Sequence, residues 1–354
     1  MKSSDVAARL GVELPIIQGP FGGGLSTVQL AATVSNAGGL GSFGAHILSP
    51  EAIATTTRAL REQTSKPFAL NLWISNQDPG GLDFDAATFQ AALAPLVPYF
   101  LEHDLPLPTL PASSAVGFKY EVQIEALLEA RPPVFSFVFG IPEPKILEAC
   151  RARRIVTIGA ATSIAEAQAL ESAGVDLIVA TGSEAGGHRP SFLDRPEEVL
   201  MGTFGLVQLI SARVRTPVIA AGGVVDGRGV QAARALGAQA VQVGTAFLAC
   251  EESGASTEHR KMLHSPRSER TTLTRSFSGR LARGLENRWA REWQGRTTAP
   301  YPLQGYLAAQ LRKGLAERQG PVTELGALWG SQVAPNLRHH RAIDVMNSLI
   351  EGLD

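Results

Sequence analysis

The chain has 354 residues, of which 44% are hydrophobic and 18% charged, with 36 glycines and 22 prolines. These values are typical of a folded globular protein with many tight turns and argue against a disordered chain. The 32 basic and 33 acidic residues give a net charge of −1, so the sequence offers no positive field that would attract a nucleic acid.

The two cysteines, Cys150 and Cys250, lie far apart in the sequence, which indicates neither a disulfide framework nor a metal-binding pair. The first residues lack the apolar core of a signal peptide, and no segment offers roughly 18 uninterrupted apolar residues. We therefore expect a cytoplasmic protein in a reducing compartment, without a membrane-spanning segment. The sequence carries no signal for an oligomeric state.

Eight short apolar runs rich in β-branched residues recur along the chain, with helical patterns between them. This alternation predicts βαβ units and a parallel sheet. The expected strands are residues 14–17, 39–42, 68–72, 134–139, 155–158, 177–180, 218–221 and 240–243. Eight consecutive units favour a (β/α)₈ TIM barrel, and an open doubly wound sheet is the alternative.

Several intervening helices have recognisable start signals. Ser49 before Pro50 opens one helix, and Asp226 opens another before residues 227–229. Ser163 and Glu166 form the pattern of a capping box, and the helix that follows them is expected to end at Gly174.

Two stretches depart from the repeating pattern. Residues 75–118 resemble an insertion between the third and fourth strands, with at most one or two helices. Residues 251–354 continue past the eighth strand and are expected to form a mostly helical extension that folds back against the barrel mouth. We therefore expect a barrel in residues 1–250 and a C-terminal extension in residues 251–354.

In a barrel, function is expected in the loops that follow the strands. Glycine pairs stand after the last two strands, at Gly222 and Gly223 and at Gly244 with Thr245. Consecutive backbone N–H groups at such turns can hold a phosphate, although glycines there can also simply make tight turns. Together, after adjacent strands, they indicate a phosphate site.

The sixth strand runs into a loop that begins at Thr181 and ends at His188, directly after Gly186 and Gly187. Histidine titrates nearest neutrality and can accept a proton from a carbon acid or hold a developing anion. A surface histidine without function is the alternative. At the barrel mouth, beside two small residues that allow a flat ligand to approach, His188 is the leading catalytic candidate.

Other residues complete the expected mouth. Gly22 follows the first strand, and Asn71 at the end of the third can donate to and accept from a ring edge. His46 follows the second strand and could reach the mouth. No histidine pair has metal-ligand spacing with acids, so no metal site is expected.

Taken together, these motifs resemble the nitronate monooxygenase family, formerly called 2-nitropropane dioxygenases, and more closely its class I branch. The similarity covers residues 15–41, 136–142, 184–189, 217–229 and 242–248, and continues at 252–256, 278–284 and 327–329. The run Glu-Ala-Gly-Gly-His-Arg at 184–189, in register with the glycine pairs, is its most specific part.

This resemblance implies an FMN-containing TIM barrel that oxidises alkyl nitronates, such as propionate 3-nitronate, with O₂ to a carbonyl compound and nitrite. It implies that His188 is the active-site histidine. By position, Asn71, Gly186, Gly223 and Gln242 to Thr245 look like the FMN contacts of the family. Together with Gly22, Thr181, Gly187 and Gly222, which we also expect at the mouth, they form the expected cofactor site: Gly22, Asn71, Thr181, Gly186, Gly187, Gly222, Gly223, Gln242, Gly244 and Thr245.

The sequence departs from the family at the flavin and substrate region. Thr181 stands where the family usually has glutamine, Phe21 where it often has methionine, and Pro190 where it often has glycine. Phe21 would replace an adaptable pocket wall by a rigid ring. Tyr301 and Tyr306 in the extension could close the substrate pocket, or they could serve packing alone.

Three alternatives to this function remain open at the level of sequence. An NAD(P)H-dependent quinone or enoyl reductase would use the same flavin barrel. A flavin-free isomerase or lyase would use the phosphate site for a phosphorylated substrate. A catalytically silent ligand-binding barrel would leave the His188 loop without a role.

Overall fold

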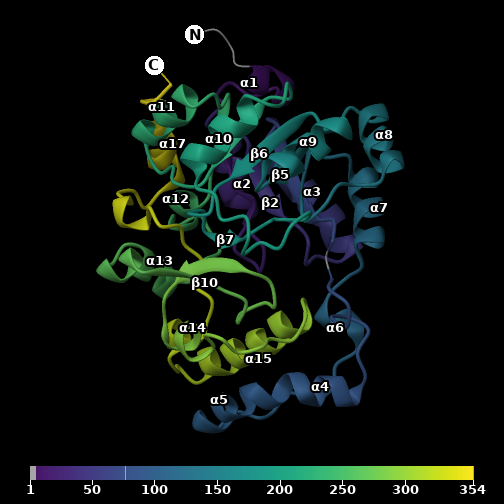
Figure 1. Cartoon of the computed structure of the whole chain (residues 1–354), viewed down its shortest axis with the longest axis vertical. Coiled ribbons are helices and arrows are strands. Elements are labelled where there is room, and N and C mark those ends of the chain that lie inside the picture. Colours follow the sequence, from purple (N-terminus) through teal and green to yellow (C-terminus); the bar gives the residue numbers. More distant parts are fainter. Residues whose placement is uncertain (1–4, 76, 354) are drawn as a thin grey trace.

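The computed structural model describes residues 5–75 and 77–353. Its centre is a sheet of eight parallel strands in the order β1-β9-β8-β6-β5-β4-β3-β2. A parallel bridge from Ile17 to Leu40 joins β1 to β2, and the Gln18 N–H donates to the Leu40 carbonyl at 2.9 Å. The sheet therefore closes on itself. The expected TIM barrel is confirmed, and the open doubly wound sheet is wrong (Figure 1).

All eight expected strands are present, with ends that differ from the expected ones by at most three residues. They are β1 (Ile16–Gln18), β2 (Gly41–Gly44), β3 (Phe68–Trp73), β4 (Val134–Val138), β5 (Val156–Ala161), β6 (Leu177–Thr181), β8 (Val218–Ala221) and β9 (Ala240–Val243). The helices between them are α2 (Val28–Asn36), α3 (Pro50–Gln63), α7 (Tyr120–Ala130), α8 (Pro144–Ala152), α9 (Ile164–Ser172), α10 (Thr203–Ser211) and α11 (Gly227–Ala235).

The predicted helix starts are confirmed, with one difference. Ser49 and Asp226 cap α3 and α11, and Ser163 accepts from the Glu166 N–H at 3.2 Å. The Glu166 carboxylate, however, does not return to Ser163. It is wholly buried and accepts from the Thr162 N–H and hydroxyl and from the Phe192 and Leu193 N–H groups. A buried carboxylate favours the site with most donors, so Glu166 ties β5 to the loop after β6.

Alternation along the strands separates two cores. In β8, Val218 and Ala220 pack toward the helices, while Ile219 and Ala221 fill the barrel interior. Helix α1 (Asp5–Leu10) adds buried apolar side chains to the interior cluster at its end of the barrel. The interior is therefore a packed core, which leaves the loops at the opposite end to form a site.

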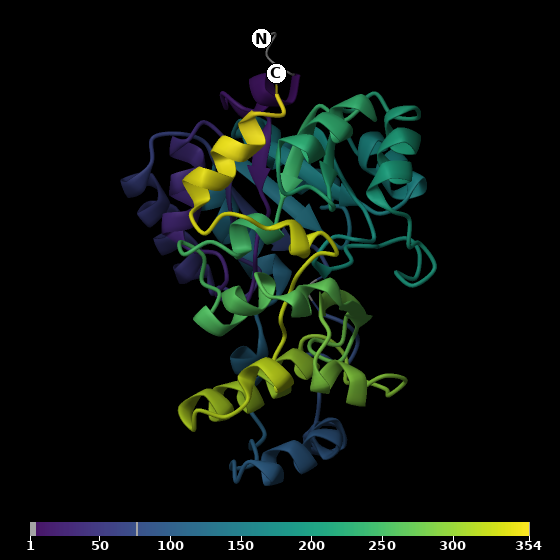
Figure 2. The same ribbon diagram turned by 90° about the vertical axis from the view of Figure 1, so that its left-hand side faces the viewer.

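A second layer lies below the barrel in Figures 1 and 2 and joins the insertion to the C-terminal extension. The insertion supplies α4 (Ala86–Leu93), α5 (Val97–Glu102) and α6 (Ser113–Val116), and the extension supplies α14 (Arg288–Glu292), α15 (Leu303–Glu317) and α16 (Val322–Leu325). Residues from α4, α5, α14 and α15 share one apolar cluster around Trp289 and Phe89. The two irregular stretches of the sequence thus fold together.

The extension also contains strands that the sequence did not indicate. β10 (Thr271–Thr274) and β11 (Ala282–Leu285) form an antiparallel pair, and β11 pairs with the short strand β7 (Gly187–His188). The remaining helices of this region are α12 (Thr245–Leu248) and α13 (Thr257–Leu263). The pairing of β11 with β7 places the extension directly on the His188 loop.

The last helix, α17 (Ala342–Ile350), lies beside the barrel and not at its mouth. It packs between α2 and α11, and its Met346 and Leu349 side chains are fully buried. Residues beyond 250 therefore complete the outer ring of helices. The division of the chain at residue 250 stays a prediction.

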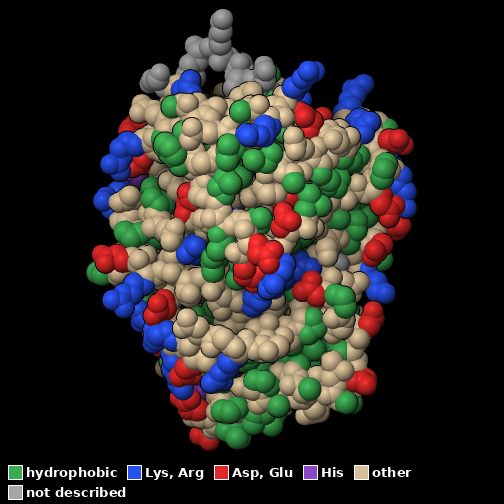
Figure 3. Space-filling model, viewed as in Figure 1, with side chains coloured by type: hydrophobic (Ala, Val, Ile, Leu, Met, Phe, Trp, Pro, Cys, Tyr) green, Lys and Arg blue, Asp and Glu red, His purple; other side chains and the backbone are tan. Residues whose placement is uncertain are grey.

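Charged side chains are interspersed over the face in Figure 3, without a broad field of one sign. Within the two described ranges, no helix has both the length and the apolar character needed to span a membrane.

Replacement of Leu349 by alanine tests the contribution of α17. The leucine is 0% exposed, so Leu349→Ala should lower the free energy of unfolding by about 2–5 kcal/mol. Asn347→Ala, at an exposed position of the same helix, should change it by less than about 0.5 kcal/mol. Urea denaturation followed by circular dichroism measures both. Equally small effects would show that the barrel does not depend on this helix.

Candidate active site

A cluster of aromatic rings lies at the carboxyl ends of the strands, around Trp73 at the end of β3. The His46 ring stacks on Trp73 with centroids 4.0 Å apart and planes within 10°. Phe139, His188 and Tyr301 approach the same indole at 4.7, 4.9 and 5.0 Å. Three strand ends, the β6 loop and the extension therefore meet at one point.

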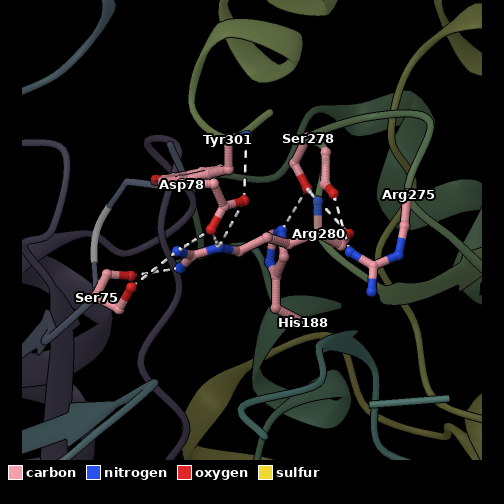
Figure 4. Close-up of polar contacts among 8 residues, drawn as sticks. Ser75, Asp78, His188, Arg275, Ser278, Arg280 and Tyr301 are labelled. Atoms are coloured by element: carbon pink, nitrogen blue, oxygen red, sulfur yellow. Dashed lines mark hydrogen bonds and ion pairs between the residues drawn. The ribbon is translucent and has the colours of Figure 1, made fainter. Parts of the chain in front are cut away.

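His188 is held in place from the extension. Its backbone pairs with Ala282 in β11, and its Nε2 lies 2.8 Å from the Ser278 hydroxyl (Figure 4). The Ser278 hydroxyl also donates to the Arg280 carbonyl at 3.2 Å. These contacts fix the orientation of the imidazole, although residues 188 and 278 are 90 positions apart.

Both imidazoles beside Trp73 are neutral at physiological pH. Burial, and to a smaller extent the positive charge of Arg280, lower the pKa of His188 to about 3. Burial also lowers the pKa of His46 to about 3, with smaller contributions from His188 and Arg280. A neutral imidazole can donate one hydrogen bond and accept another, but it brings no charge to the site.

The positive charge comes from Arg280, whose side chain is 8% exposed. Its guanidinium pairs with Asp78 at 2.7 Å and donates to the Ser75 carbonyl at 2.5 Å (Figure 4). It also lies 4.5 Å from the Phe139 ring centroid and 4.7 Å from that of Tyr301. Aromatic faces attract a cation, so these contacts hold the guanidinium flat between rings.

Tyr301 joins the same arrangement through its backbone. Its carbonyl accepts from the Asp78 N–H at 2.8 Å, and its N–H donates to the Asp78 carboxylate at 3.3 Å. The phenol is buried, and this burial raises its pKa above the usual range. Tyr306, by contrast, lies in α15 and packs against the helical cluster of the second layer.

The expected phosphate cradle has the required backbone. Gly222 and Gly223 adopt positive φ values of 105° and 75°, which L residues with a side chain rarely adopt. None of the described residues accepts a hydrogen bond from either N–H. Gly244 precedes the short helix α12, whose first residue, Thr245, accepts at its hydroxyl from the Ser331 N–H at 3.0 Å. The free N–H groups fit a phosphate dianion.

Two of the predicted glycines are required by close approaches. A Cβ at Gly22 would lie 2.0 Å from the His46 ring, and one at Gly186 would lie 2.6 Å from the Gly330 backbone. Gly187, with a φ of 81°, has no atom within 4 Å of such a position. The absence of a side chain at Gly22 and Gly186 lets His46 and the extension pack closely at the mouth. Gly187 leaves open space beside His188.

The remaining predicted residues also line this end of the barrel. The Asn71 amide donates to the Ser136 hydroxyl at 3.0 Å, and Gln242 lies opposite Ile17 in the β1–β9 register. The Thr181 side chain is buried, and its carbonyl accepts from Arg189 at 2.9 Å. Phe21 lies within reach of Gly244, since a Cβ at Gly244 would be 3.7 Å from its ring.

Sequence reasoning missed several residues of the cluster. Trp73 stands two positions after Asn71, so its place at a strand end was available from the strand pattern. Arg280 and Ser278 lie in a motif that supported the family resemblance, but nothing there gave them a role. Asp78 had no signal at all, because its partner lies 202 positions away.

The chain matches known proteins over nearly its whole length. A family model described as "Nitronate monooxygenase" matches residues 4–352. A "Probable nitronate monooxygenase" of Staphylococcus haemolyticus is 38% identical, covering 99% of this chain and 96% of that protein. One of Staphylococcus aureus is also 38% identical, with coverages of 98% and 96%.

Solved structures agree with the sequence matches. The nitroalkane oxidase of Streptomyces ansochromogenes superposes with a TM-score of 0.86 at 33% identity, covering 98% of this chain and 97% of that one. FabK of Thermotoga maritima superposes with a TM-score of 0.74 at 27% identity, with coverages of 99% and 96%.

The low pKa of His46 predicts a pH-dependent stability. The unfolded chain binds a proton on this imidazole below about pH 6.5, whereas the folded protein does so only near pH 3. The free energy of unfolding should therefore fall as the pH drops through this interval. His46→Phe keeps a ring against Trp73 but cannot titrate. Between pH 6.5 and 5, its free energy of unfolding should therefore fall by on the order of 2 kcal/mol less than that of wild type.

Urea denaturation at each pH measures this difference. Between pH 8 and 7, the two proteins should change equally, because His46 is then neutral in both states. Identical losses between pH 6.5 and 5 would contradict the assignment of a neutral buried His46.

Proposed function

Because this chain belongs to the nitronate monooxygenase family and is therefore a flavin-dependent oxidoreductase, we propose that it binds FMN and oxidises alkyl nitronates with O₂. The products would be a carbonyl compound and nitrite, and the substrates nitronates of the propionate 3-nitronate type. The observation that carries this proposal is His188, held neutral beside Trp73 at the same end of the barrel as a backbone cradle that fits a phosphate.

The FMN phosphate would lie against Gly222, Gly223, Gly244 and Thr245, whose backbone groups suit a dianion. The residues that would hold the rest of FMN are the other predicted contacts: Gly22, Asn71, Thr181, Gly186, Gly187 and Gln242. When bound, FMN supplies the acceptor for the electrons that leave the nitronate and the reactivity toward O₂. The protein would position the substrate, supply positive charge and exclude water from the site.

His188 would contact the nitro oxygens of the substrate. As a neutral imidazole, it can donate a hydrogen bond to an anionic oxygen without carrying charge. A group with a pKa near 3 is also a weak base, since base efficiency rises with basicity. The site therefore suits a nitronate, which has already lost its α-proton, better than a neutral nitroalkane.

The substrate pocket would be walled by rings. Tyr301 lies over Arg280 and against Trp73, and Phe21 faces Gly244 from the first loop. These rigid rings exclude water from the space in front of His188, which strengthens electrostatic contacts to an anion. Tyr306 packs further out and would act through the position of α15.

Anaerobic mixing of the purified protein with its candidate reductants tests this function. The protein should be yellow, and propionate 3-nitronate should bleach the flavin band, while NADH and NADPH should not. Readmission of O₂ should restore the band and release nitrite. Reduction by a pyridine nucleotide alone would instead indicate the quinone or enoyl reductase, and a colourless protein would indicate the flavin-free isomerase or lyase.

Replacement of His188 separates its two candidate roles. If a nitroalkane is accepted, His188 must also remove its α-proton, a step for which a positioned base contributes about 10²–10⁴-fold. His188→Asn should therefore lower kcat/KM for nitroethane by more than it lowers kcat/KM for ethylnitronate. Both are measured by O₂ consumption, with the flavin content of the variant as control. An equal loss on both substrates, or no loss on either, would refute this division of roles.

A further inference from the structure

A cavity of about 240 Å³ lies beside the Trp73 cluster, outside the residues assigned to FMN. Its lining comes from the insertion, the loops after β4 and β6, and the turn before β11. Phe139 and Arg280 belong both to this lining and to the ring cluster, so the cavity adjoins the active site at these two side chains.

Three arginines line the cavity at increasing depth. The Arg275 side chain is 39% exposed, that of Arg280 is 8% exposed, and Arg189 is 2% exposed as a residue. Asp78 is the one acidic side chain in the lining. A small space bounded by three guanidinium groups is suited to an oxyanion, because these groups present planar arrays of donors.

Two of these arginines have their own carboxylates. Arg280 pairs with Asp78 at 2.7 Å, and Arg275 pairs with Glu197 at 2.7 Å. Glu166, near Arg189, is already occupied by four donors from residues 162, 192 and 193. Carboxylates therefore balance the charges of Arg280 and Arg275, whereas Arg189, the most buried of the three arginines, has no carboxylate of its own.

Arg189 is a buried cation without an acidic partner. Its terminal nitrogens donate to the carbonyls of Thr181, Gly182 and Val199 at 2.7–3.1 Å. No carboxylate among the described residues lies within ion-pair distance of it, so Glu166 and Glu184 act on its charge only from further away. Its buried Nε–H has no acceptor. Burial without full compensation is unfavourable for a charge, and here it lowers the pKa of Arg189 to about 10.

We propose that this cavity is a subsite for the carboxylate group of a small organic acid, bound by Arg189 and Arg275 next to the active site. A carboxylate there would accept from the Nη2 groups of Arg189 and Arg275, which both keep a donor free, and would balance the charge of Arg189. It can come from two sources: the second anionic group of a carboxylate-bearing nitronate, which rests on the proposed function, or a separate acid bound beside the substrate.

Titration of the flavin-loaded enzyme with succinate, followed by isothermal titration calorimetry, tests the subsite. Wild type should bind succinate with a Kd in roughly the millimolar range, and sodium chloride at equal ionic strength should not replace it. Arg275→Gln should weaken binding by about tenfold or more. Arg267→Gln is the matched control, because Arg267 also forms a surface ion pair, with Glu324 at 2.6 Å, away from the cavity.

Steady-state kinetics identify the source of the carboxylate. If it belongs to the substrate, Arg275→Gln should lower the ratio of kcat/KM for propionate 3-nitronate to that for ethylnitronate by about tenfold, and succinate should compete with propionate 3-nitronate. If it belongs to a separate acid, the ratio should stay constant and succinate should bind together with propionate 3-nitronate. Either result supports the subsite.

Absence of succinate binding to wild type, or equal binding by Arg275→Gln, Arg267→Gln and wild type, would overturn the proposal. Because calorimetry uses no nitronate, a protein that binds succinate but oxidises no nitronate would refute the proposed function and leave the subsite intact.

Discussion

The arrangement of the barrel mouth depends on the pairing of Arg280 with Asp78. This contact joins the turn before β11 to the insertion after β3. The ring of Phe139, from the barrel, and the ring of Tyr301, from the extension, pack against the same guanidinium. Arg280 is buried but Asp78 is 34% exposed, so desolvation offsets part of their attraction. Loss of Asp78 would leave the buried charge of Arg280 without its partner, which is unfavourable. Ser278, two positions before Arg280, hydrogen-bonds to His188 and so fixes its position relative to this ion pair.

The side chains at the barrel mouth differ in the charge that they bring to the site. The imidazoles of His46 and His188 are neutral and contribute shape and hydrogen bonds, whereas guanidinium groups supply the positive charge. Histidine often serves as a charge switch near neutral pH, but burial beside a fixed cation removes that property here. A site of this kind keeps the same charge across the physiological pH range, which suits an anionic substrate.

Short-range sequence patterns predicted most of the barrel but few of the contacts that hold its mouth together. The eight strands, the caps at Ser49 and Asp226 and the glycine cradle follow from short-range patterns, since burial alternation, capping and positive φ are properties of neighbouring residues. His188 was found because a titratable residue follows a strand end.

The remainder depends on contacts across long sequence separations. The pairing of β11 with β7 and the ion pair of Asp78 with Arg280 join residues that only the closed fold brings together. No local pattern specifies such partners, which is also why the three arginines around one cavity were not recognised as a group.

The position of α17 has a consequence for biosynthesis. The helix that fills the gap between α2 and α11 spans residues 342–350, so both of its neighbours are synthesised well before it. While α17 remains in the ribosomal tunnel, the apolar faces of α2 and α11 lack their cover. Strand pairing can begin at this stage, but the outer ring of helices closes only after α17 has emerged. Each nascent chain therefore exposes an apolar groove until that point, and a chaperone that recognises such surfaces would bind the chain before α17 docks.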